Sequence, residues 1–255
     1  MDIAHTRITS SWLPTIQWRN GWQALQAEAG IQQPSVWMVN PKSFFDQVTR
    51  QVEPILSRDE STRAGRFYQA DHALRFKAAH TALRLVLASA IHANPAELRF
   101  ERGRHNKPGL ASPANTGVQF NVSYTDRRAI IGLNASQPIG VDIEWAKRPL
   151  AIDSMLEACF SRDEITFICA QAEKMQQRFF TLWTRKEAIL KLTGEGIGEH
   201  LPHFEVLDGE RLAKKDIIGG TPPDEVYLYS FEAEAGYIGC FSSPKPLTEC
   251  FFYRL

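Results

Sequence analysis

The stretch F-F-T-L-W-T-R-K-E-A-I-L-K-L-T-G-E-G-I, residues 179–197, decides the fold around which the rest of the chain is arranged. Its spacing predicts one helix of about four turns, because Gly194 and Gly196 provide the glycine signal at which helices commonly end. At about 100° per residue, the helix has one apolar arc, and Lys186 falls inside it. The apolar members of the arc are Phe179, Leu182, Ile189 and Leu190.

The charged residues of this helix need separate interpretations. Glu187 and Lys191, one and two turns beyond Trp183, fit a solvated i,i+4 pair that contributes only about a few tenths of a kcal/mol. That interpretation does not cover Lys186, because a lysine in a core-facing arc must extend its ammonium group to water or find an anionic partner. The helix is therefore a candidate for a functional site.

The strand expected at residues 139–145, I-G-V-D-I-E-W, brings two more acidic residues together. Side chains two positions apart in a strand share a face, so Asp142 and Glu144 point the same way and Val141 and Ile143 point the other way. Two carboxylates about 6–7 Å apart repel each other unless a cation lies between them. With Glu187 they would supply three hard oxygen ligands for Mg²⁺, whereas alone the D-x-E pattern also fits an exposed strand.

The remaining sequence alternates helices and strands. A helical region is predicted at residues 54–92 with Ser57 as a cap, a helix at 151–160, and another from Ser161, whose spacing to Glu164 fits a capping box. The predicted strands are residues 36–39 (the first), 98–101, 118–126, 129–135, 139–145, 204–207, 225–232 and 237–241. The fold class is therefore α+β with two related units, residues 1–136 and 137–255.

Length and composition exclude several classes of protein. With 255 residues, 44% hydrophobic and 23% charged, the chain is expected to be globular, with one large or two small domains. No apolar run reaches about 18 residues and the N-terminal residues lack a signal-peptide pattern, so we expect a cytoplasmic protein without a membrane span. The four cysteines show no C-x-x-C spacing, which favours buried free thiols over structural zinc. H-E-x-x-H, G-x-S-x-G and P-loop patterns are absent.

The formal net charge of zero hides a difference between the two halves. Residues 1–136 contain 16 Lys and Arg against 10 Asp and Glu, whereas residues 137–255 contain 13 against 19. A polyanion-binding face joined to an acidic, metal-binding face would give this pattern, and so would uneven surface charge alone. The clustered basic residues, which fit a solvated surface or phosphate contacts, are Arg63, Arg66, Arg75, Lys77, Arg102, Arg104, His105 and Lys107.

Several of these segments together resemble the signature blocks of the Sfp-type 4′-phosphopantetheinyl transferases. The strand matches G-[IV]-D-[IVL]-E, and the helix, about forty residues further on, matches W-x-x-K-E-[AS]-x-x-K-x-x-G-x-G. The segment R-G-R-H-N-K-P at 102–108 resembles the upstream G-K-P turn of the family, and R-F-Y followed by A-L-R-F resembles its basic N-terminal helix. The similarity runs through residues 67–197 with the motifs in the family's order.

The resemblance implies a monomer of two similar helix-plus-antiparallel-sheet halves related by a pseudo-twofold axis. The first half would bind coenzyme A, and the second would hold the metal and the catalytic helix. It also implies transfer of the 4′-phosphopantetheine arm from coenzyme A to a serine of an acyl or peptidyl carrier protein of fatty acid, polyketide or nonribosomal peptide synthesis, with release of 3′,5′-ADP. The carriers would be transient partners, with no nucleic acid or membrane partner.

The resemblance also assigns roles by position. The implied ligands of Mg²⁺, with Mn²⁺ as a substitute, are Asp142, Glu144 and Glu187. Glu187 is also the implied base, and Asp142 and Lys191 complete the catalytic group. The residues at positions that resemble coenzyme A contacts are Arg63, Arg66, Arg75, Arg102, Lys107, Ser123, Tyr124, Lys186 and Lys191.

One position departs from the family pattern. Members commonly have histidine after the serine of F-N-x-S-H, where this chain has Tyr124. A tyrosine hydroxyl can bond to a phosphate oxygen but cannot carry positive charge. We therefore predict weaker or differently salt-sensitive binding of coenzyme A without loss of activity.

Two other functions remain open at this point. A Mg²⁺-dependent nuclease or phosphodiesterase would also use D-x-E with lysines, but Lys147 stands three residues beyond Glu144 rather than at the spacing expected for such enzymes. A non-catalytic carrier-binding homologue would be expected to lack some of the metal and catalytic residues. The four that matter for this test are all present: Asp142, Glu144, Glu187 and Lys191.

Overall fold

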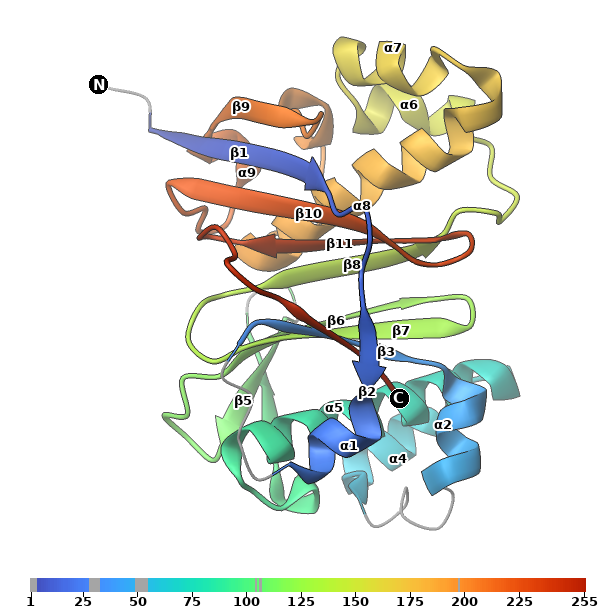
Figure 1. Ribbon diagram of the computed structural model, residues 1–255, viewed down its shortest axis with the longest axis vertical. Coiled ribbons are helices and arrows are strands. Elements are labelled where there is room, and N and C mark those ends of the chain that lie inside the picture. Colours follow the sequence, from blue (N-terminus) through green and yellow to red (C-terminus); the bar gives the residue numbers. More distant parts are fainter. Residues whose placement is uncertain (1–3, 28–32, 49–54, 104, 106, 197) are drawn as a thin grey trace. The chain divides into compact units, whose positions relative to one another are not determined.

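The computed structural model describes residues 4–27, 33–48, 55–103, 105, 107–196 and 198–255. The chain divides into two compact units, each with its own hydrophobic core (Figure 1). Unit 1 contains Met1–Ile16, Arg104–Lys107 and Pro138–Thr248. Unit 2 contains Gln17–Gly103, Pro108–Gln137 and Glu249–Leu255.

Unit 1 is built on a five-stranded sheet in the order β8-β11-β10-β1-β9. Neighbouring strands are antiparallel except β1 and β10, which run parallel. The strands are β1 (His5–Trp12), β8 (Gly140–Trp145), β9 (Gly209–Lys214), β10 (Glu225–Glu234) and β11 (Tyr237–Ser243). The helices are α6 (Asp153–Cys159), α7 (Arg162–Cys169), α8 (Met175–Thr193) and α9 (Lys215–Ile218), with 3-10 turns η3 (Ala172–Lys174) and η4 (Leu201–His203). Helix α8 packs against β8, β10 and β11.

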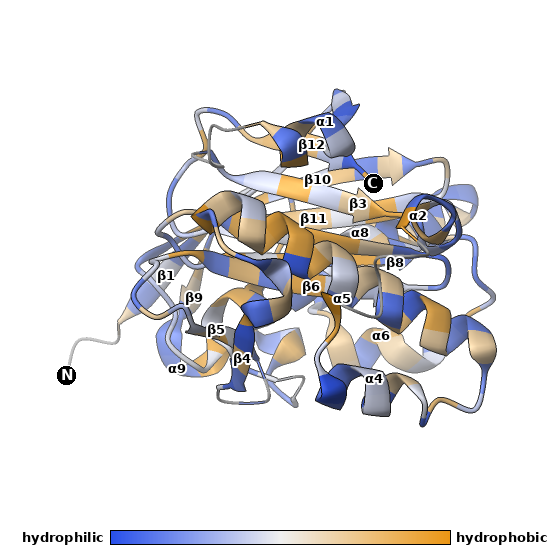
Figure 2. Ribbon diagram, turned by 90° about the horizontal axis from the view of Figure 1, so that it is seen from below, coloured by the Kyte–Doolittle hydropathy of each residue, from blue (hydrophilic) through white to orange (hydrophobic). Residues whose placement is uncertain are grey.

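Unit 2 has a second five-stranded sheet, in the order β2-β12-β3-β7-β6, and a two-stranded ribbon of β4 and β5. Its strands are β2 (Trp18–Asn20), β3 (Ser35–Val39), β4 (Arg99–Arg102), β5 (Pro108–Ser112), β6 (Gln119–Thr125), β7 (Arg128–Asn134) and β12 (Phe251–Arg254). Its helices are α1 (Gly21–Gln26), α2 (Pro41–Val48), α4 (Arg58–Ala64) and α5 (Ala70–Ile91), followed by the 3-10 turn η1 (Pro95–Glu97). Figure 2 shows hydrophobic residues along β3, whose five residues are all buried, and hydrophilic residues over α4.

The two units repeat one topology, which confirms the predicted α+β fold of two similar halves. In unit 2, strand β3 leads through helices to the β6–β7 hairpin and pairs antiparallel with its second strand, β7. In unit 1, strand β8 leads through helices to the β10–β11 hairpin and pairs antiparallel with its second strand, β11. A long helix precedes the hairpin in both units: α5 in unit 2 and α8 in unit 1.

The two ends of the chain are exchanged between the units. Strand β1 at the N-terminal end lies between β10 and β9 in the sheet of unit 1, and β12 at the C-terminal end lies between β3 and β2 in the sheet of unit 2 (Figure 1). The units therefore differ from the linear division at residues 136 and 137, although one crossing of the chain, at Gln137–Pro138, falls there. Local sequence patterns do not reveal such an exchange, because strand pairing across more than 200 residues depends on the whole fold.

Most predicted elements are present, and the differences have local causes. The strand expected at 204–207 is wrong, because these residues follow η4 as irregular chain whose backbone is bonded to helix side chains. Residues 36–39 belong to β3 rather than to the first strand, and β1, β2, β5, β9 and β12 were not predicted. Of the four cysteines, Cys159 and Cys240 are buried as expected, while Cys169 is exposed and Cys250 is half-buried.

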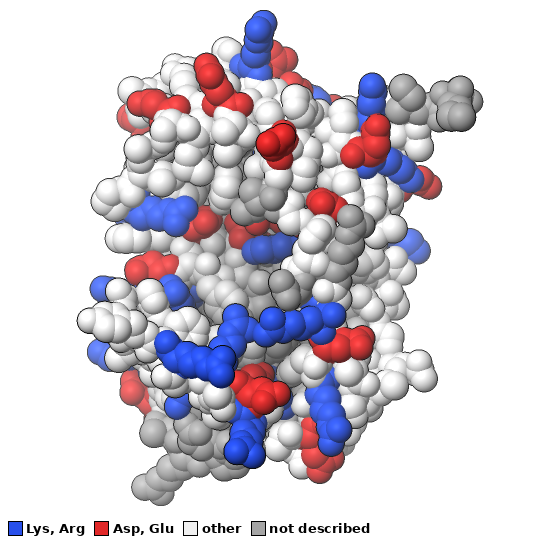
Figure 3. Space-filling model, turned by 180° about the vertical axis from the view of Figure 1, so that it is seen from behind, with Lys and Arg blue, Asp and Glu red and all other residues white. Residues whose placement is uncertain are grey.

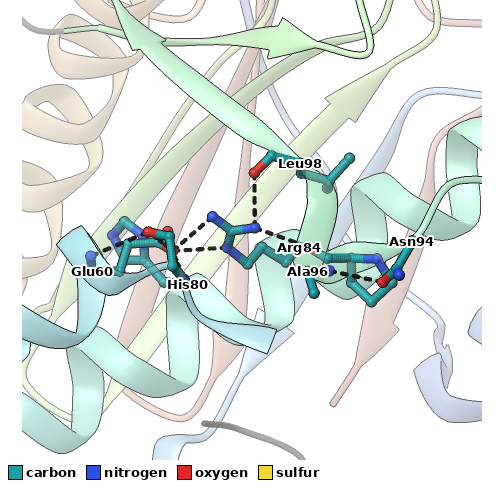
Figure 4. A network of polar contacts seen from close by, with 8 residues as sticks. Glu60, His80, Arg84, Asn94, Ala96 and Leu98 are labelled. Atoms are coloured by element: carbon teal, nitrogen blue, oxygen red, sulfur yellow. Dashed lines mark hydrogen bonds and ion pairs between the residues drawn. The ribbon is translucent and has the colours of Figure 1, made fainter. Parts of the chain in front are cut away.

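Unit 2 contains a buried ion pair that fixes its long helix (Figure 4). Glu60, in the capping box of α4, accepts a hydrogen bond from Nε of Arg84 on α5 at 2.8 Å and is 2.8 Å from Nδ1 of His80. Arg84 also donates to the carbonyl oxygens of Pro95 and Leu98, at 2.8 and 3.0 Å. Burial alone would raise the pKa of Glu60, but the bonds to His80 and the backbone, with the charge of Arg84, lower it to about 2.

Unit 1 repeats this arrangement with a lysine. Glu164, in the capping box of α7 that the sequence predicted, lies 2.8 Å from Nζ of Lys186 on α8, and both side chains are fully buried. Lys186 also donates to the carbonyl oxygens of Leu201 and Phe204, at 2.7 and 2.6 Å. In each unit, then, the glutamate of a capping box contacts a cationic side chain of the long helix, and that side chain donates to carbonyl oxygens at the following 3-10 turn.

Among the helices of the described residues, none combines the length and the apolar character needed to cross a bilayer.

Candidate active site

The candidate site is built on helix α8, which the sequence placed at residues 179–193. The helix begins four residues earlier, at Met175, and ends where predicted, since Gly194 takes the left-handed conformation (φ 75°) at the C-cap. The left-handed conformation costs glycine less free energy than it costs other residues, which explains the first glycine of the motif. Residue 197 lies outside the described residues.

Gly140, the first residue of β8, allows this helix to touch the strand. A Cβ atom on Gly140 would collide with the carbonyl oxygen of Ala188 and would lie 2.7 Å from the backbone nitrogen of Leu192. The hydroxyl of Ser242 lies within hydrogen-bond distance of the carbonyl oxygens of Gly140 (3.2 Å) and Ala188 (2.8 Å). The glycine of the G-V-D-I-E block therefore sets the distance between the strand and the helix that carry the acidic residues.

We expect Gly140→Ala to lower the free energy of unfolding by about 1–3 kcal/mol, because the added methyl group must push α8 away from β8. The same displacement separates Asp142 from Lys191, so activity should fall even at temperatures where the variant is folded. Chemical denaturation and the initial rate, measured on the same preparation, check both effects. Gly65→Ala is the control, since a Cβ there meets no atom closer than 3.6 Å. Unchanged stability of Gly140→Ala would contradict the proposed packing.

Asp142 and Lys191 form the central ion pair of the site. Oδ1 of Asp142 accepts a hydrogen bond from Nζ of Lys191 at 2.7 Å, joining β8 to α8. The side chain of Asp142 is buried, whereas Lys191 keeps a quarter of its side chain exposed. The solvated i,i+4 interpretation of Glu187 and Lys191 is thus wrong for the lysine, which contacts a carboxylate on the neighbouring strand.

Glu187 lies close enough to Asp142 and Glu144 to be affected by their charges, and we call these three carboxylates the acidic group. Burial raises the pKa of Glu187 to about 7, and the negative charges of Asp142 and Glu144 add to this effect while the charge of Lys191 opposes it. Its Oε1 atom is buried and has no hydrogen-bond partner within the described ranges of the chain. A carboxylate with this pKa exchanges protons near neutral pH, which suits a general base.

Glu144 forms an ion pair with an arginine that the sequence analysis did not identify. Oε1 of Glu144 lies 3.3 Å from Nη2 of Arg148, four residues further along the chain. No three acidic, histidine or cysteine side chains in the described part of the chain converge closely enough to hold one metal ion as they stand. Cationic side chains contact two of the three predicted metal ligands, Asp142 and Glu144.

Lys186 lies away from this group, so its predicted contact with coenzyme A phosphate needs correction. Its side chain is fully buried, with Nζ bound to Glu164 and two carbonyl oxygens and lying 4.5 Å from the ring centroid of Phe204. All three ammonium hydrogens have partners, and burial lowers its pKa although Glu164 opposes that shift. The anionic partner that the sequence required for this lysine is therefore a glutamate of the same unit.

Lys107 and His105 of the basic turn contact the C-terminal end of α8. Nζ of Lys107 donates to the carbonyl oxygen of Leu192 at 3.1 Å, and burial lowers the pKa of Lys107. Nδ1 of His105 lies 3.0 Å from the carbonyl oxygen of Gly194. Cations at this end of a helix satisfy its free carbonyl groups. The basic turn and the glycine end of the second signature block thus lie together in unit 1.

In unit 2, three of the predicted coenzyme A residues gather on one side. Arg63 lies over the ring of Phe76, with Cζ 5.1 Å from its centroid, and Arg75 donates to the carbonyl oxygen of Asp126 at 2.7 Å. Both arginines act on the nearby Tyr124, whose pKa is raised to about 12, chiefly by burial, with the arginines opposing. Tyr124 is therefore a neutral phenol at physiological pH.

The other residues of unit 2 that were predicted to contact coenzyme A are Ser123, Arg66 and Arg102. Ser123 is buried and, next to Tyr124 in β6, points to the opposite face of the strand, which argues against a shared contact with coenzyme A. Arg66 and Arg102 are exposed, after α4 and at the end of β4. Figure 3 shows one face of the molecule, on which Lys and Arg side chains form a continuous band with Asp and Glu side chains beside it.

Three residues of unit 1 that were not predicted as site residues, Arg185, Glu164 and Arg148, have partners in the structure. Arg185 is buried and donates to Ser230 Oγ, to the carbonyl oxygen of Val206 and to Asp208, at 2.7, 2.8 and 2.6 Å. The capping box at Ser161 and Glu164 was the one sequence signal for Glu164, and its contact with Lys186 required the fold. For Arg148 the available signal was its i,i+4 spacing from Glu144, which usually describes a helix pair rather than a strand end.

The sequence matches a family model and several known proteins. A family model described as the 4′-phosphopantetheinyl transferase superfamily matches residues 138–238. The chain is 33% identical over 160 residues to the 4′-phosphopantetheinyl transferase HetI of Nostoc sp., which covers 61% of this chain and 68% of HetI. It is 30% identical over 185 residues to a putative 4′-phosphopantetheinyl transferase of Synechocystis sp. (72% of this chain, 73% of the relative). It is 28% identical over 186 residues to the 4′-phosphopantetheinyl transferase Sfp of Bacillus subtilis (71% and 79%). The chain therefore belongs to the family of 4′-phosphopantetheinyl transferases.

Proposed function

We propose that this transferase carries out its reaction at the acidic group of unit 1. The reaction of the family moves the 4′-phosphopantetheine arm of coenzyme A to a serine hydroxyl of a carrier protein. The observation that supports the location is the meeting of β8 and α8, where Lys191 contacts Asp142 at 2.7 Å and Glu187 keeps a buried oxygen without a partner among the described residues. Such a combination offers a base, a cation for phosphate and oxygen ligands for a metal.

Glu187 is the proposed base. It accepts the serine proton, directly or through a water, so that the serine oxygen can attack the phosphorus of the phosphopantetheine arm. The bond from that phosphorus to the bridging oxygen of the diphosphate breaks, and 3′,5′-ADP leaves with the electron pair. Lys191 is placed to donate to a diphosphate oxygen as negative charge develops there.

Asp142, Glu144 and Glu187 are the proposed ligands of a Mg²⁺ ion, or of Mn²⁺ in its place, once Asp142 and Glu144 exchange their present cationic partners for the metal. Their carboxylate oxygens are the ligands that these ions prefer, and the buried Oε1 of Glu187 lacks a partner in the described chain. When bound, the ion would neutralise the diphosphate as the bridging oxygen departs. The three carboxylates would hold it, with Lys191 moving from Asp142 toward phosphate.

The basic side chains are the proposed contacts of the other phosphates of coenzyme A. Arg63 and Arg75 of unit 2 lie near the hydroxyl-bearing Tyr124, and Arg66 and Arg102 are exposed. Lys107 of unit 1 already donates to a carbonyl oxygen and would have to exchange that partner for phosphate. Because each of these is a charge-assisted contact, binding of coenzyme A should weaken as salt is added.

Incubation with an apo-carrier protein, coenzyme A and Mg²⁺, followed by intact-mass measurement of the carrier, tests the function. We expect one phosphopantetheine group per carrier and no transfer when the metal is chelated. A panel of carriers from fatty acid, polyketide and peptide synthesis would identify the carriers that the enzyme serves. Folded enzyme that modifies no carrier would contradict the proposal, and Mg²⁺-dependent cleavage of plasmid DNA would instead support the nuclease alternative.

Tyr124 allows a second test. We expect Tyr124→His to tighten binding of coenzyme A and to make it more sensitive to salt, because protonated histidine adds a cation beside Arg63 and Arg75. Calorimetric titration with coenzyme A at two salt concentrations and at pH 6 and 8 measures this, and the gain should be larger at pH 6. Tyr124→Phe is the control that adds no charge. An unchanged affinity of Tyr124→His would show that this side chain does not face the phosphates.

We also propose that the enzyme acts as a monomer in the cytoplasm and meets its carriers only transiently. The four cysteines are free, which agrees with a reducing compartment, because disulfides are rare there. Sedimentation of the purified protein over a range of concentrations tests the monomer.

A further inference from the structure

Two carboxylates of the acidic group already have cationic side chains as partners. Lys191 contacts Asp142 at 2.7 Å and Arg148 contacts Glu144 at 3.3 Å. With Glu187 ionised, three carboxylates therefore share the site with two positive side chains. From these five described side chains, a divalent ion that arrives alone meets one net negative charge instead of the three of the carboxylates, so its electrostatic attraction to them is weak.

Arg148 is held at this position by helix α8 and not only by Glu144. Its guanidinium group lies over the ring of Phe180, with Cζ 5.0 Å from the centroid, and its carbonyl oxygen accepts a hydrogen bond from the side chain of Gln176. Phe180 is fully buried, so the contact surface is fixed. The positive charge of Arg148 therefore remains beside Glu144 whether or not the carboxylate changes its partner.

The site also leaves one donor and one acceptor unsatisfied. Nε of Arg148 and Oε1 of Glu187 are both buried, and neither finds a hydrogen-bond partner among the residues that the structure describes. Buried polar atoms of this kind normally have partners. The carboxylate oxygen of Glu187 can accept a cation, while the N–H of Arg148 can only donate to an anion. A metal ion by itself would provide a partner only for Oε1 of Glu187. A metal ion together with a phosphate would provide partners for Oε1 of Glu187 and for Nε of Arg148.

We propose that Arg148 and Lys191 are built-in counter-ions of the acidic group, so that the chain binds free divalent ions weakly and takes them up together with a diphosphate. Asp142 and Glu144 exchange these cations for the metal, and the released guanidinium and ammonium groups donate to diphosphate oxygens. This inference rests on the proposed function, because it takes the same carboxylates as metal ligands. It adds a positioning role for Arg148 and a binding order.

The test measures Mn²⁺ binding, by the loss of the free-ion paramagnetic resonance signal, without a carrier and therefore without turnover. Titrations of the wild-type chain with and without saturating coenzyme A, corrected for Mn²⁺ bound by coenzyme A itself, should differ by at least about tenfold in affinity. 3′,5′-ADP, which has no diphosphate, should produce much less of this gain. Because coupling is reciprocal, Mn²⁺ should strengthen coenzyme A binding by the same factor.

Arg148→Gln should raise the affinity for free Mn²⁺ about tenfold, the effect of removing one unit charge next to a ligand carboxylate. It should also reduce the coupling to coenzyme A by a similar factor. Arg148→Lys keeps the charge and should resemble the wild type in free-metal affinity. Arg178→Gln removes an equal charge from helix α8, where Arg178 lies over the ring of Phe167, and should change neither quantity.

Two results would overturn the inference: wild-type affinity for Mn²⁺ that is the same with and without coenzyme A, or Arg148→Gln that binds free Mn²⁺ no more tightly although it remains folded. Either result with normal modification of a carrier would leave the proposed function standing. Coupled binding of Mn²⁺ and coenzyme A in a chain that modifies no carrier would support the counter-ions and refute the function. The two proposals thus fail independently.

Discussion

Replacing Glu187 by glutamine is expected to slow transfer to the carrier by a factor of about 10²–10⁴, the usual contribution of a positioned base, with a further loss if metal binding fails. Glutamine has nearly the same shape, but its amide neither accepts the serine proton nor carries negative charge. The fold should be retained, because the change removes repulsion from Asp142 and Glu144 that helps to raise the pKa of Glu187 to about 7. Initial rates by intact mass, beside thermal unfolding of the same protein, measure both quantities.

The pH dependence of metal binding provides an independent check. The proton on Glu187 must leave before the carboxylate can hold a cation. Because the pKa is raised to about 7, Mg²⁺ affinity should fall as the pH is lowered through that value and should change little above about pH 8. In Glu187→Gln this dependence should disappear. Unimpaired transfer by Glu187→Gln would refute the role of the residue as the base.

Replacing Lys186 by methionine is expected to lower the free energy of unfolding by about 3–5 kcal/mol, the cost of leaving one charge of a buried pair without its partner. Glu164 would remain fully buried opposite an apolar side chain, and the carbonyl oxygens of Leu201 and Phe204 would lose their donor. Chemical denaturation measures this loss. The apparent affinity for coenzyme A should remain unchanged in the folded enzyme, because Lys186 has no exposed surface with which to reach a phosphate.

The double variant Lys186→Met with Glu164→Gln is the informative control. Removing both charges should recover a large part of the lost stability, since neutral replacements of a buried pair are often tolerated. Lys191→Met is the matched lysine change, and it should affect activity more than stability because Lys191 is partly exposed. Weaker binding of coenzyme A by Lys186→Met, with the stability of the wild type, would restore the phosphate contact that the resemblance implied.

The elements that the sequence predicted well are those with strong local signals. Helix α8 ends at the expected Gly194, the cap predicted at Ser57 and the capping box predicted at Ser161 form, and the β6–β7 and β10–β11 hairpins are present. Strands β1 and β12 escaped prediction because each belongs to a sheet built from the opposite end of the chain. Their residues gain a reason to be strands only from partners more than 200 positions away.

The sequence by itself determined the family, the α+β pattern and the acidic and basic residue types of the site, because spacing along a strand or helix is a local property. The tertiary structure alone decided which of these residues meet. In the folded chain Lys191 contacts Asp142, Arg148 contacts Glu144, and Lys186 contacts Glu164 in the core. The physical reason is that a charge acts on whatever lies within a few ångströms of it, and those neighbours come from elements that only the packing of α8 on its sheet brings together.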